Sequence, residues 1–390
     1  MNENNTVNPL RFNGRTGEFF GIWIVNILLS VVTLGVYSAW AKVRTKRYFY
    51  GNTYLAEDNF EYHGTPKQIL KGRAVAMLCL LMWVMLSSVS EVASAVLLIL
   101  FYLVLPWMMW SNVRFDSAMT SYRNTHFAFA GTLKQAYITF MGRGVVAILG
   151  FILGISVIVV ITRMVNSVLL IVVMAIAFVA LCAFIQAWVM TGVWRYFMNG
   201  YRYGNAEFSA ILTSKKLFFI NLGAIGIFIS GVLMMLVLGC IFFYSMVMNI
   251  IMDIDLFMYS MNDTMFGSII LGYLLLIIIG MISAAYMSVR IRNYVYSQTS
   301  VSLENQSLKL NSSFSVLKYV GLLLTNILGL IFTLGLAHPW VKVRMANYAA
   351  EQTQVIGDLE MIKAVDQDSD VRSALGDELV QAFDINLGIG

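Results

Sequence analysis

The sequence predicts an all-α polytopic membrane protein, built from internally repeated helix pairs with short cytoplasmic β-hairpin connectors and two possible re-entrant segments. Of its 390 residues, 59% are hydrophobic and only 12% are charged, whereas soluble domains carry about 25% charged residues. Long charge-free stretches alternate with short basic segments, and several reach the roughly 20 apolar residues that a membrane-crossing helix needs. This pattern excludes a disulfide scaffold, a disordered tail protein and a nucleic-acid-binding domain.

The basic residues predict which loops face the cytoplasm. Five segments hold 21 of the 26 Lys and Arg residues, namely 42–73, 112–143, 195–216, 290–318 and 342–344. Lys and Arg are retained on the cytoplasmic side of short membrane-protein loops. We therefore expect these five segments and the C-terminus to be cytoplasmic, in a multi-pass protein.

A repeat runs through the whole chain. Ten of nineteen positions are identical between 26–44 and 326–344, and both copies end in a Trp-x-Lys-Val-Arg motif. The motif residues expected at membrane exits are Trp40, Lys42, Arg44, Trp110, Arg114, Arg290, Trp340, Lys342 and Arg344. An aromatic residue at the interface with a base beyond it is typical of a helix that leaves the bilayer on the cytoplasmic side.

Each exit is followed by a second recurring pattern that predicts a turn, a short strand and a new helix. Phe60, Phe127, Phe208 and Leu308 mark the strands, and Thr65, Thr132, Thr213 and Ser313 stand five residues later as helix N-caps. Alternating apolar residues favour a strand and Thr or Ser favours an N-cap. A partial copy of this pattern also opens the chain at residues 10–14.

These repeats divide residues 1–350 into a membrane domain with three helix pairs, at 74–110, 144–190 and 217–288. The segments 19–41 and 319–341 do not fit as single crossings, because that would place Lys42 and Lys342 on opposite faces of the membrane. We predict re-entrant segments that break at Gly35 and Gly335, since glycine tolerates unusual backbone angles. A full crossing of each segment is the alternative.

The last forty residues, 351–390, have a different character. They carry nine acidic and two basic residues. Val371, Leu375, Leu379 and Phe383 recur at helical spacing. We expect an acidic cytoplasmic tail with a short amphipathic helix that docks on the basic surface, or else a free solvated tail.

The repeated motifs resemble those of the YjgN family, bacterial inner-membrane proteins classed as a domain of unknown function. The resemblance rests on the residues from Phe12 to Tyr48, with Asn26-Ile27-Leu28, Thr33-Leu34-Gly35 and Trp40-Ala41-Lys42, and on the acidic ending at 376–389. It covers essentially the whole chain. It implies a location in the bacterial inner membrane and supplies no activity, substrate or catalytic residue.

Little in the membrane segments points to chemistry. An ionisable residue in a span is a usual sign of ion coupling, and the predicted spans contain none. The polar candidates for a cavity are Asn26, Asn326, Gln186 and Asn221, although hydrogen bonds between packed helices are the commoner use of such residues. The three histidines lack a spaced ligand set and no phosphate loop or nucleophile motif occurs. We therefore expect no enzyme activity, no metal and no cofactor.

Two classes of function fit these observations. Repeat symmetry and broken membrane segments favour a conduit or carrier for a small uncharged or lipid-like substrate. The alternative is a non-transporting scaffold or regulator of envelope partners. Expected partners are membrane lipids, and either an envelope protein or further copies of the chain, with no nucleic acid. A cavity lined by Asn26, Asn326 and Gln186 would favour transport.

Overall fold

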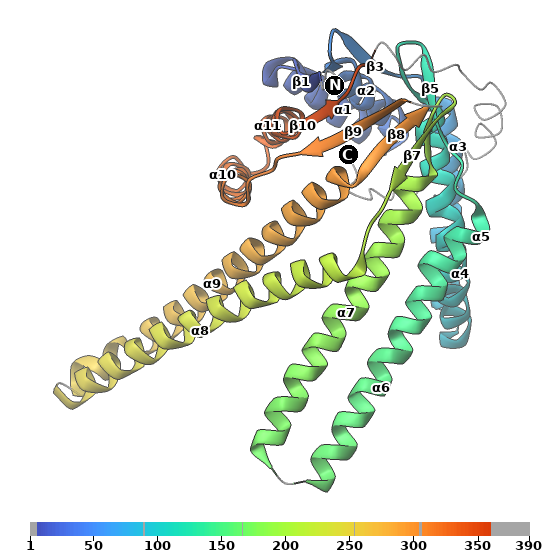
Figure 1. Ribbon diagram of the computed structural model, residues 1–390. Coiled ribbons are helices and arrows are strands. Elements are labelled where there is room, and N and C mark those ends of the chain that lie inside the picture. The colour runs from blue at the N-terminus through green and yellow to red at the C-terminus, as the bar shows by residue number, and fades with distance from the viewer. Residues whose placement is uncertain (1–5, 89, 166, 253, 304–305, 360–390) are drawn as a thin grey trace.

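In the computed structural model, the described residues are 6–88, 90–165, 167–252, 254–303 and 306–359. They form five units of the order strand, helix pair, strand, joined by hairpins (Figure 1). The first two units are β1 (Val7–Phe12), α1 (Thr16–Val32), α2 (Ser38–Gly51), β2 (Thr53–Leu55), and β3 (Asp58–Tyr62), α3 (Pro66–Ser87), α4 (Glu91–Ala118), β4 (Thr120–Tyr122). The third is β5 (Thr125–Phe129), α5 (Leu133–Ala136), the π-helix η1 (Tyr137–Gly142), α6 (Arg143–Met164), α7 (Val168–Gly200), β6 (Tyr201–Tyr203). The last two are β7 (Ala206–Ala210), α8 (Ser214–Met252), α9 (Ile254–Ser297), β8 (Thr299–Leu303), and β9 (Gln306–Ser312), α10 (Val316–Phe332), α11 (His338–Glu351), β10 (Thr353–Ile356).

The ten strands close into one antiparallel barrel, so the prediction of an all-α protein is wrong. The strand order follows the chain around the barrel, and β1 pairs with both β2 and β10 to close it. Every hairpin strand thus pairs with a strand of the neighbouring unit, which leaves no open edge. The N-terminal half-copy of the repeat is explained by this closure, because β1 completes the hairpin that β10 begins.

Five cross-strand pairs fill the barrel with apolar side chains, which we call the barrel ring. They are Leu10 with Leu55, Phe60 with Tyr122, Phe127 with Tyr203, Phe208 with Val301, and Leu310 with Val355. All ten residues belong to one hydrophobic cluster. The hydroxyl of Tyr203 donates to the Tyr122 carbonyl at 2.9 Å, which ties adjacent hairpins together inside the barrel.

The barrel ring corrects the register of the last repeat. Strand pairing makes Leu310, not Leu308, the counterpart of Phe60, Phe127 and Phe208. The N-cap of α10 is accordingly Ser315, not Ser313. The hairpin of β8 and β9 is longer than the other hairpins, at five and seven residues. The pattern around Leu308 therefore falls in its extra length.

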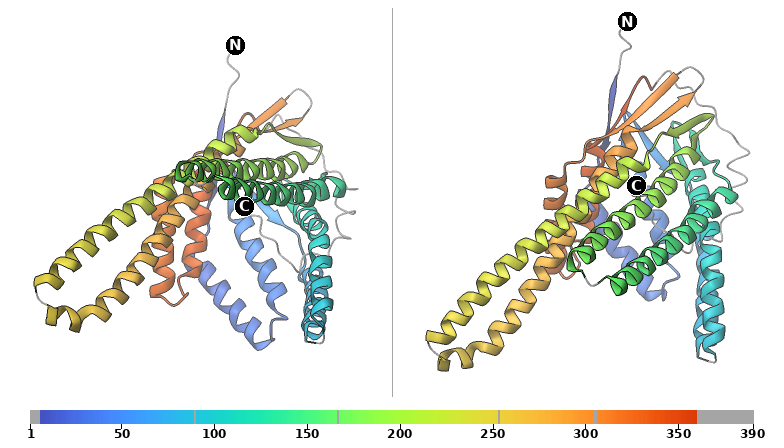
Figure 2. Two further views of the ribbon diagram at one scale, coloured as in Figure 1. Left: turned by 90° about the horizontal axis from the view of Figure 1, so that it is seen from below. Right: turned by 60° about the horizontal axis from the view of Figure 1, so that its bottom comes forward.

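The helix pairs project from one end of the barrel and spread apart (Figures 1 and 2). Among the described residues, five helical segments are long and apolar enough to cross a membrane: Glu91–Ala118, Leu133–Met164, Val168–Gly200, Ser214–Ile241 and Phe266–Ser297. The pairs α1/α2 and α10/α11 are shorter, and α1 contacts α11 beneath the barrel, where the rings of Trp23 and His338 stack at 5.7 Å.

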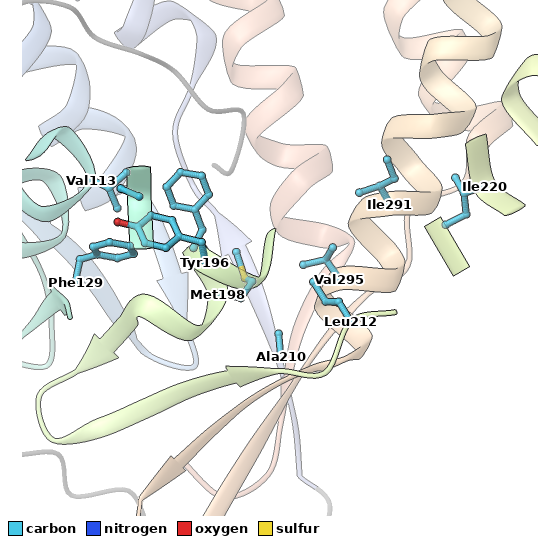
Figure 3. Packing of buried hydrophobic residues seen from close by; sticks show 11 residues of the cluster. Val113, Phe129, Tyr196, Met198, Ala210, Leu212, Ile220, Ile291 and Val295 are labelled. Atoms are coloured by element: carbon cyan, nitrogen blue, oxygen red, sulfur yellow. The ribbon is translucent and has the colours of Figure 1, made fainter. Parts of the chain in front are cut away.

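A cluster of buried hydrophobic residues joins helices and strands of the second, third and fourth units. Phe129 of β5 and Tyr196 of α7 meet edge to face at 5.4 Å, next to Val113 of α4 (Figure 3). Leu212 and Val295 continue the same cluster toward α9. This cluster anchors the helix ends to the barrel. The predicted apolar stripe of the tail, at residues 371–383, lies outside the described residues.

Candidate functional site

A cavity of about 980 Å³ lies directly under the barrel ring, between the barrel and the helices α1, α2 and α4. The lining residues on α1 are Trp23, Asn26, Ile27, Ser30 and Val31, and those on α2 are Ser38, Ala41, Lys42, Thr45, Lys46 and Tyr50. Those on α4 are Asn112, Val113, Asp116 and Ser117, and Thr120 follows at the start of β4. Spacings of three and four residues place each set on one face of its helix. Each of the three helices therefore presents one continuous face to the cavity.

The end of the cavity nearest the barrel is aromatic. Phe60, Phe127, Phe208 and Leu310 of the barrel ring line it, together with Tyr50, Tyr201 and Tyr296. Burial raises the pKa of the Tyr50 hydroxyl, and Lys46 opposes this shift. The phenol therefore stays neutral near pH 7, as a hydrogen-bonding group and not as an anion.

The middle of the cavity is basic. Lys42, Lys46, Arg73 and Lys342 line it, and Asp116 is the one acidic residue among the described residues of the lining. Nζ of Lys46 forms an ion pair with Oδ1 of Asp116 at 2.7 Å. Nη1 of Arg73 donates to Oγ of Ser38. Four cations against one carboxylate leave a net positive charge in the lining.

Asn26 sits in the cavity wall with one unsatisfied atom. The residue is only 6% exposed, and its Nδ2 donates weakly to the Ala41 carbonyl at 3.4 Å. Its Oδ1 is buried and accepts no hydrogen bond from any described residue. A buried carbonyl oxygen without a donor is unfavourable by about 1–3 kcal/mol, so this atom is suited to accept from a bound molecule.

The structure does not bring the other predicted polar residues to this cavity. Asn326 is buried in α10, where its Oδ1 accepts from Arg344 Nη1 at 3.2 Å. Asn221 joins α8 to α7 through a 3.3 Å hydrogen bond to the Ala183 carbonyl. Gln186 is exposed on α7. Asn26 and Asn326, although equivalent in the repeat, therefore do not line a common site.

The exit motif divides into an inward and an outward position. Arg114, Arg290 and Arg344 stack their guanidinium groups on the aromatic residue four positions earlier, at 5.0, 5.5 and 4.9 Å from the ring centres of Trp110, Tyr286 and Trp340. Arg44 is exposed, and Trp40 packs on a core cluster below the barrel. Two positions before the arginine, Lys42, Asn112 and Lys342 face the cavity. The inward position thus carries the variation between repeats.

Gly35 and Gly335 lie in identical turns between the helices of the two short pairs. The N–H of Gly35 donates to the Ser30 carbonyl and that of Leu34 to the Val31 carbonyl, at 2.7 and 3.1 Å, which is the Schellman pattern of a helix C-terminus. Leu34 and Leu334 have φ of 50°, and Gly35 and Gly335 have φ of 90°. Thr33 accepts from the Tyr37 N–H at 2.9 Å, which links the turn to the next helix.

Sequence reasoning missed Lys46 and Arg73 as site residues because it treated every base outside the spans as an orientation signal, and it assigned no role to Asp116. A usable signal exists on α2, where Ser38, Lys42, Lys46 and Tyr50 recur every four residues. The carboxylate that pairs with Lys46 comes from another unit, 70 positions along the chain. Only the tertiary structure identifies that partner.

Two histidines that are distant in sequence meet at the barrel. The ring centres of His63 and His126 lie 5.1 Å apart, and Nε2 of His63 lies 2.7 Å from Oγ of Ser121. Burial, followed by the neighbouring His126, lowers the pKa of His63. In the part of the chain that the structure describes, no group of three or more His, Cys, Asp or Glu residues could hold a metal ion.

A barrel that carries five helix pairs, with helices apolar enough to span a membrane and a basic cavity beside them, defines this chain as a polytopic membrane protein. The chain belongs to the family described as "Bacterial protein of unknown function (DUF898)", which matches residues 7–382. It is 27% identical to Inner membrane protein YjgN of Salmonella typhimurium strain LT2, over 96% of this chain and 94% of that protein. It is 26% identical to the YjgN protein of Escherichia coli K12, over 92% and 90% of the two chains.

These matches confirm the family resemblance that the motifs predict. The relatives are named inner membrane proteins, in agreement with five helices that could span a membrane in the described residues. No solved structure matches the chain.

Proposed function

We propose that the protein is a carrier for an amphipathic, lipid-like substrate whose polar end enters the cavity under the barrel. The observation that carries this proposal is the mixed lining of the cavity. Aromatic and charged groups line its inner part, whereas α1 contributes Ile27 and Val31, which are 38% and 68% exposed. The polar end of an amphipathic molecule would meet the charged and aromatic inner part of the cavity, and its apolar end would meet the exposed apolar residues of α1.

The barrel ring favours a carrier over an open pore. Its ten side chains belong to one packed cluster in the barrel, so a polar solute would have to displace them to pass along the barrel axis. Entry from the membrane side, along α1, needs no such rearrangement. The substrate would then come from the leaflet next to the barrel. The distribution of Lys and Arg residues assigns the barrel and the C-terminus to the cytoplasmic side, so this is the cytoplasmic leaflet.

The two short helix pairs would insert in this leaflet as re-entrant hairpins. α1 has 17 residues, which gives a length of about 25 Å at 1.5 Å per residue, short of the roughly 30 Å hydrocarbon core. The turn residues Leu34 and Leu334 are 91% and 94% exposed. Exposed leucines at a hairpin tip are stable in lipid and unfavourable in water.

A transport assay with a cavity-filling variant tests the proposal. Proteoliposomes would carry a headgroup-labelled fluorescent phospholipid, and dithionite quenching would report movement between leaflets. Ser30→Trp places a large ring in the cavity lining, whereas Leu28→Trp alters an exposed position two residues earlier on α1 that is not a lining residue. We expect faster quenching with the unmodified protein and Leu28→Trp than in protein-free vesicles, and loss of this gain with Ser30→Trp.

The alternative proposal is a scaffold or regulator that contacts an envelope protein or further copies of this chain. It makes no use of the cavity. Equal quenching in vesicles with and without the protein would reject the carrier and leave this alternative. Equal acceleration by the Ser30→Trp and Leu28→Trp variants would reject the cavity as the route.

A further inference from the structure

We infer that a second pocket, inside the third unit, binds the phosphate group of an anionic membrane lipid. This pocket has a volume of about 400 Å³ and lies between the helices of that unit, where they join the strands β5 and β6. Among the described residues, it shares no lining residue with the cavity under the barrel. The site is therefore independent of the proposed carrier function.

Two positively charged side chains of this pocket lack a counterion among the described residues. Arg143 and Arg195 line the pocket. Nη1 of Arg143 donates to the Trp188 carbonyl at 2.6 Å, and Nε of Arg195 donates to the Leu212 carbonyl at 2.9 Å. Backbone carbonyls carry no net charge, so these hydrogen bonds hold the two guanidinium groups in place without neutralising them. Each guanidinium has five N–H groups and can bond a further acceptor.

The two charges act on each other. Arg195 is the charged group that the surroundings of Arg143 contain, and no acidic residue occurs in the described part of the pocket lining. The third arginine of the lining, Arg202, differs because Oε1 of Glu207 pairs with it at 2.9 Å. Like charges that converge in one pocket repel, and an anion bound between them would be attracted by both.

The pocket is shaped around the side chain of Arg143. Gly192 is buried in α7, and a Cβ at this position would meet the guanidinium carbon of Arg143 more closely than side chains allow. The absence of a side chain at Gly192 therefore lets the guanidinium lie against α7. Thr139 of the π-helix η1 lines the same pocket, and its hydroxyl can donate to an oxygen of a bound anion. Single π-turns within α-helices occur frequently at functional sites.

Arg195 departs from the pattern of the other arginines at the helix exits. Arg114, Arg290 and Arg344 stack on the aromatic residue four positions earlier in their own helices. Four positions before Arg195 stands Thr191, which offers no ring. A base that only fixes the orientation of the protein in the membrane would serve equally well with either neighbour. The exit arginine of the third unit instead lines a pocket.

The two arginines stand where lipid headgroups are expected. Arg143 directly precedes the charge-free stretch 144–162, and Arg195 directly follows the charge-free stretch 164–194. Because α6 and α7 run in opposite directions side by side, both arginines lie at the end that joins the barrel (Figure 1). Basic pockets between membrane helices on the cytoplasmic side bind anionic headgroups, and the planar guanidinium group matches the geometry of a phosphate.

Native mass spectrometry of the full chain in a non-ionic detergent tests the site, with phosphatidylglycerol and phosphatidylcholine of the same acyl chains as probes. The pocket variant is Arg143→Gln with Arg195→Gln. The matched control is Lys215→Gln with Lys216→Gln, which removes the same charge from two exposed positions at the start of α8, outside the pocket lining. Thermal unfolding and size-exclusion profiles report whether both variants fold. If the pocket variant does not fold, Arg195→Gln alone replaces it, because Arg195 is exposed.

We expect the unmodified protein to bind phosphatidylglycerol at least tenfold more tightly than phosphatidylcholine, because the ammonium group of the latter would meet two like charges. The pocket variant should lose at least tenfold of the phosphatidylglycerol affinity, Arg195→Gln alone at least threefold, and the control less than twofold. Equal binding of the two lipids by the unmodified protein would overturn the site. So would equal losses in the pocket variant and the control, because the preference would then come from overall charge.

Two further arms identify the location of the lipid and the kind of ligand. The preference for phosphatidylglycerol should persist in Ser30→Trp, which fills the cavity under the barrel, and its loss there would show that the lipid binds in that cavity instead. Inorganic phosphate should displace phosphatidylglycerol only at concentrations at least a hundredfold higher, because it lacks acyl chains to contact exposed residues of α6 such as Val145 and Val146. Displacement at equal concentration would show that the ligand is a small soluble anion and would refute the lipid site.

Discussion

Replacing Gly35 by alanine probes the turn between α1 and α2 through backbone conformation alone. Gly35 has φ of 90°, and a Cβ built on it would meet no atom within 4 Å. Alanine here introduces no clash, so the whole effect is the cost of a positive φ for an L-residue. That cost is about 1–2 kcal/mol. We expect the free energy of unfolding to fall by about this amount.

Gly21 of the same helix provides a control of opposite sign. Gly21 lies inside α1, and a Cβ there also meets nothing within 4 Å. Alanine in a helix interior is more favourable than glycine by about 0.8–1 kcal/mol. Gly21→Ala should therefore stabilise the protein, and the two variants should differ by about 2–3 kcal/mol in unfolding free energy.

Equilibrium unfolding in mixed micelles, followed by tryptophan fluorescence, measures this difference. Gly335 has the same φ and equally open surroundings, so Gly335→Ala should reproduce the loss seen with Gly35→Ala. If Gly35→Ala stabilises the protein as Gly21→Ala does, the chain is helical through residue 35 and the turn does not exist in the folded protein.

Two further predictions concern packing and pH. Gly200→Ala would place a Cβ against a ring carbon of Phe129, closer than real side-chain contacts allow, and that ring is held in a core cluster. Overpacking of this kind destabilises by about 1–3 kcal/mol. Gly226→Ala has open space around it and should not lower the melting temperature, so an equal loss in both variants would contradict the assigned packing. The pKa of His63 is lowered from 6.5 by burial and then by His126, with Glu61 opposing and Arg47 adding to the shift. The folded state therefore resists protonation, and its stability is full above pH 6.5 and falls as the pH drops below that value. Between about pH 7.5 and pH 5.5 the unmodified protein should lose more thermal stability than His63→Gln; equal losses would show that His63 does not contribute.

Local sequence patterns determine much of the repeat unit. Thr65 and Thr132 form the predicted N-terminal caps, with the Gln68 and Gln135 side chains accepting from the cap N–H groups at 2.9 and 3.3 Å. These contacts join residues three positions apart, so their geometry follows from helix periodicity. The helical turn at Thr33-Leu34-Gly35 is likewise local, because its hydrogen bonds span five residues or fewer.

The closed barrel could not be read from the same patterns. Each strand has three to seven residues, and its apolar alternation predicts only a hairpin. Closure depends on strand pairs between distant residues, such as Val7 with Ile356. The register of such a pair and the entropy lost in closing the long loop between its strands cannot be deduced from the local sequence. For this reason the sequence correctly indicated short strands between the helix pairs, whereas the prediction of an all-α fold class was wrong.

The same distinction applies to the candidate site. The repeat identified Lys42, Lys342 and Asn26 as candidate functional or interfacial positions, because the periodicity of the sequence indicates which face of a helix a residue occupies. It could not distinguish Asn26, in the cavity wall, from Asn326, which accepts from Arg344. Equivalent positions in a repeat acquire different surroundings when the units close around one axis. The sequence therefore determined the unit and its helix faces, and the tertiary closure decided which faces share a cavity.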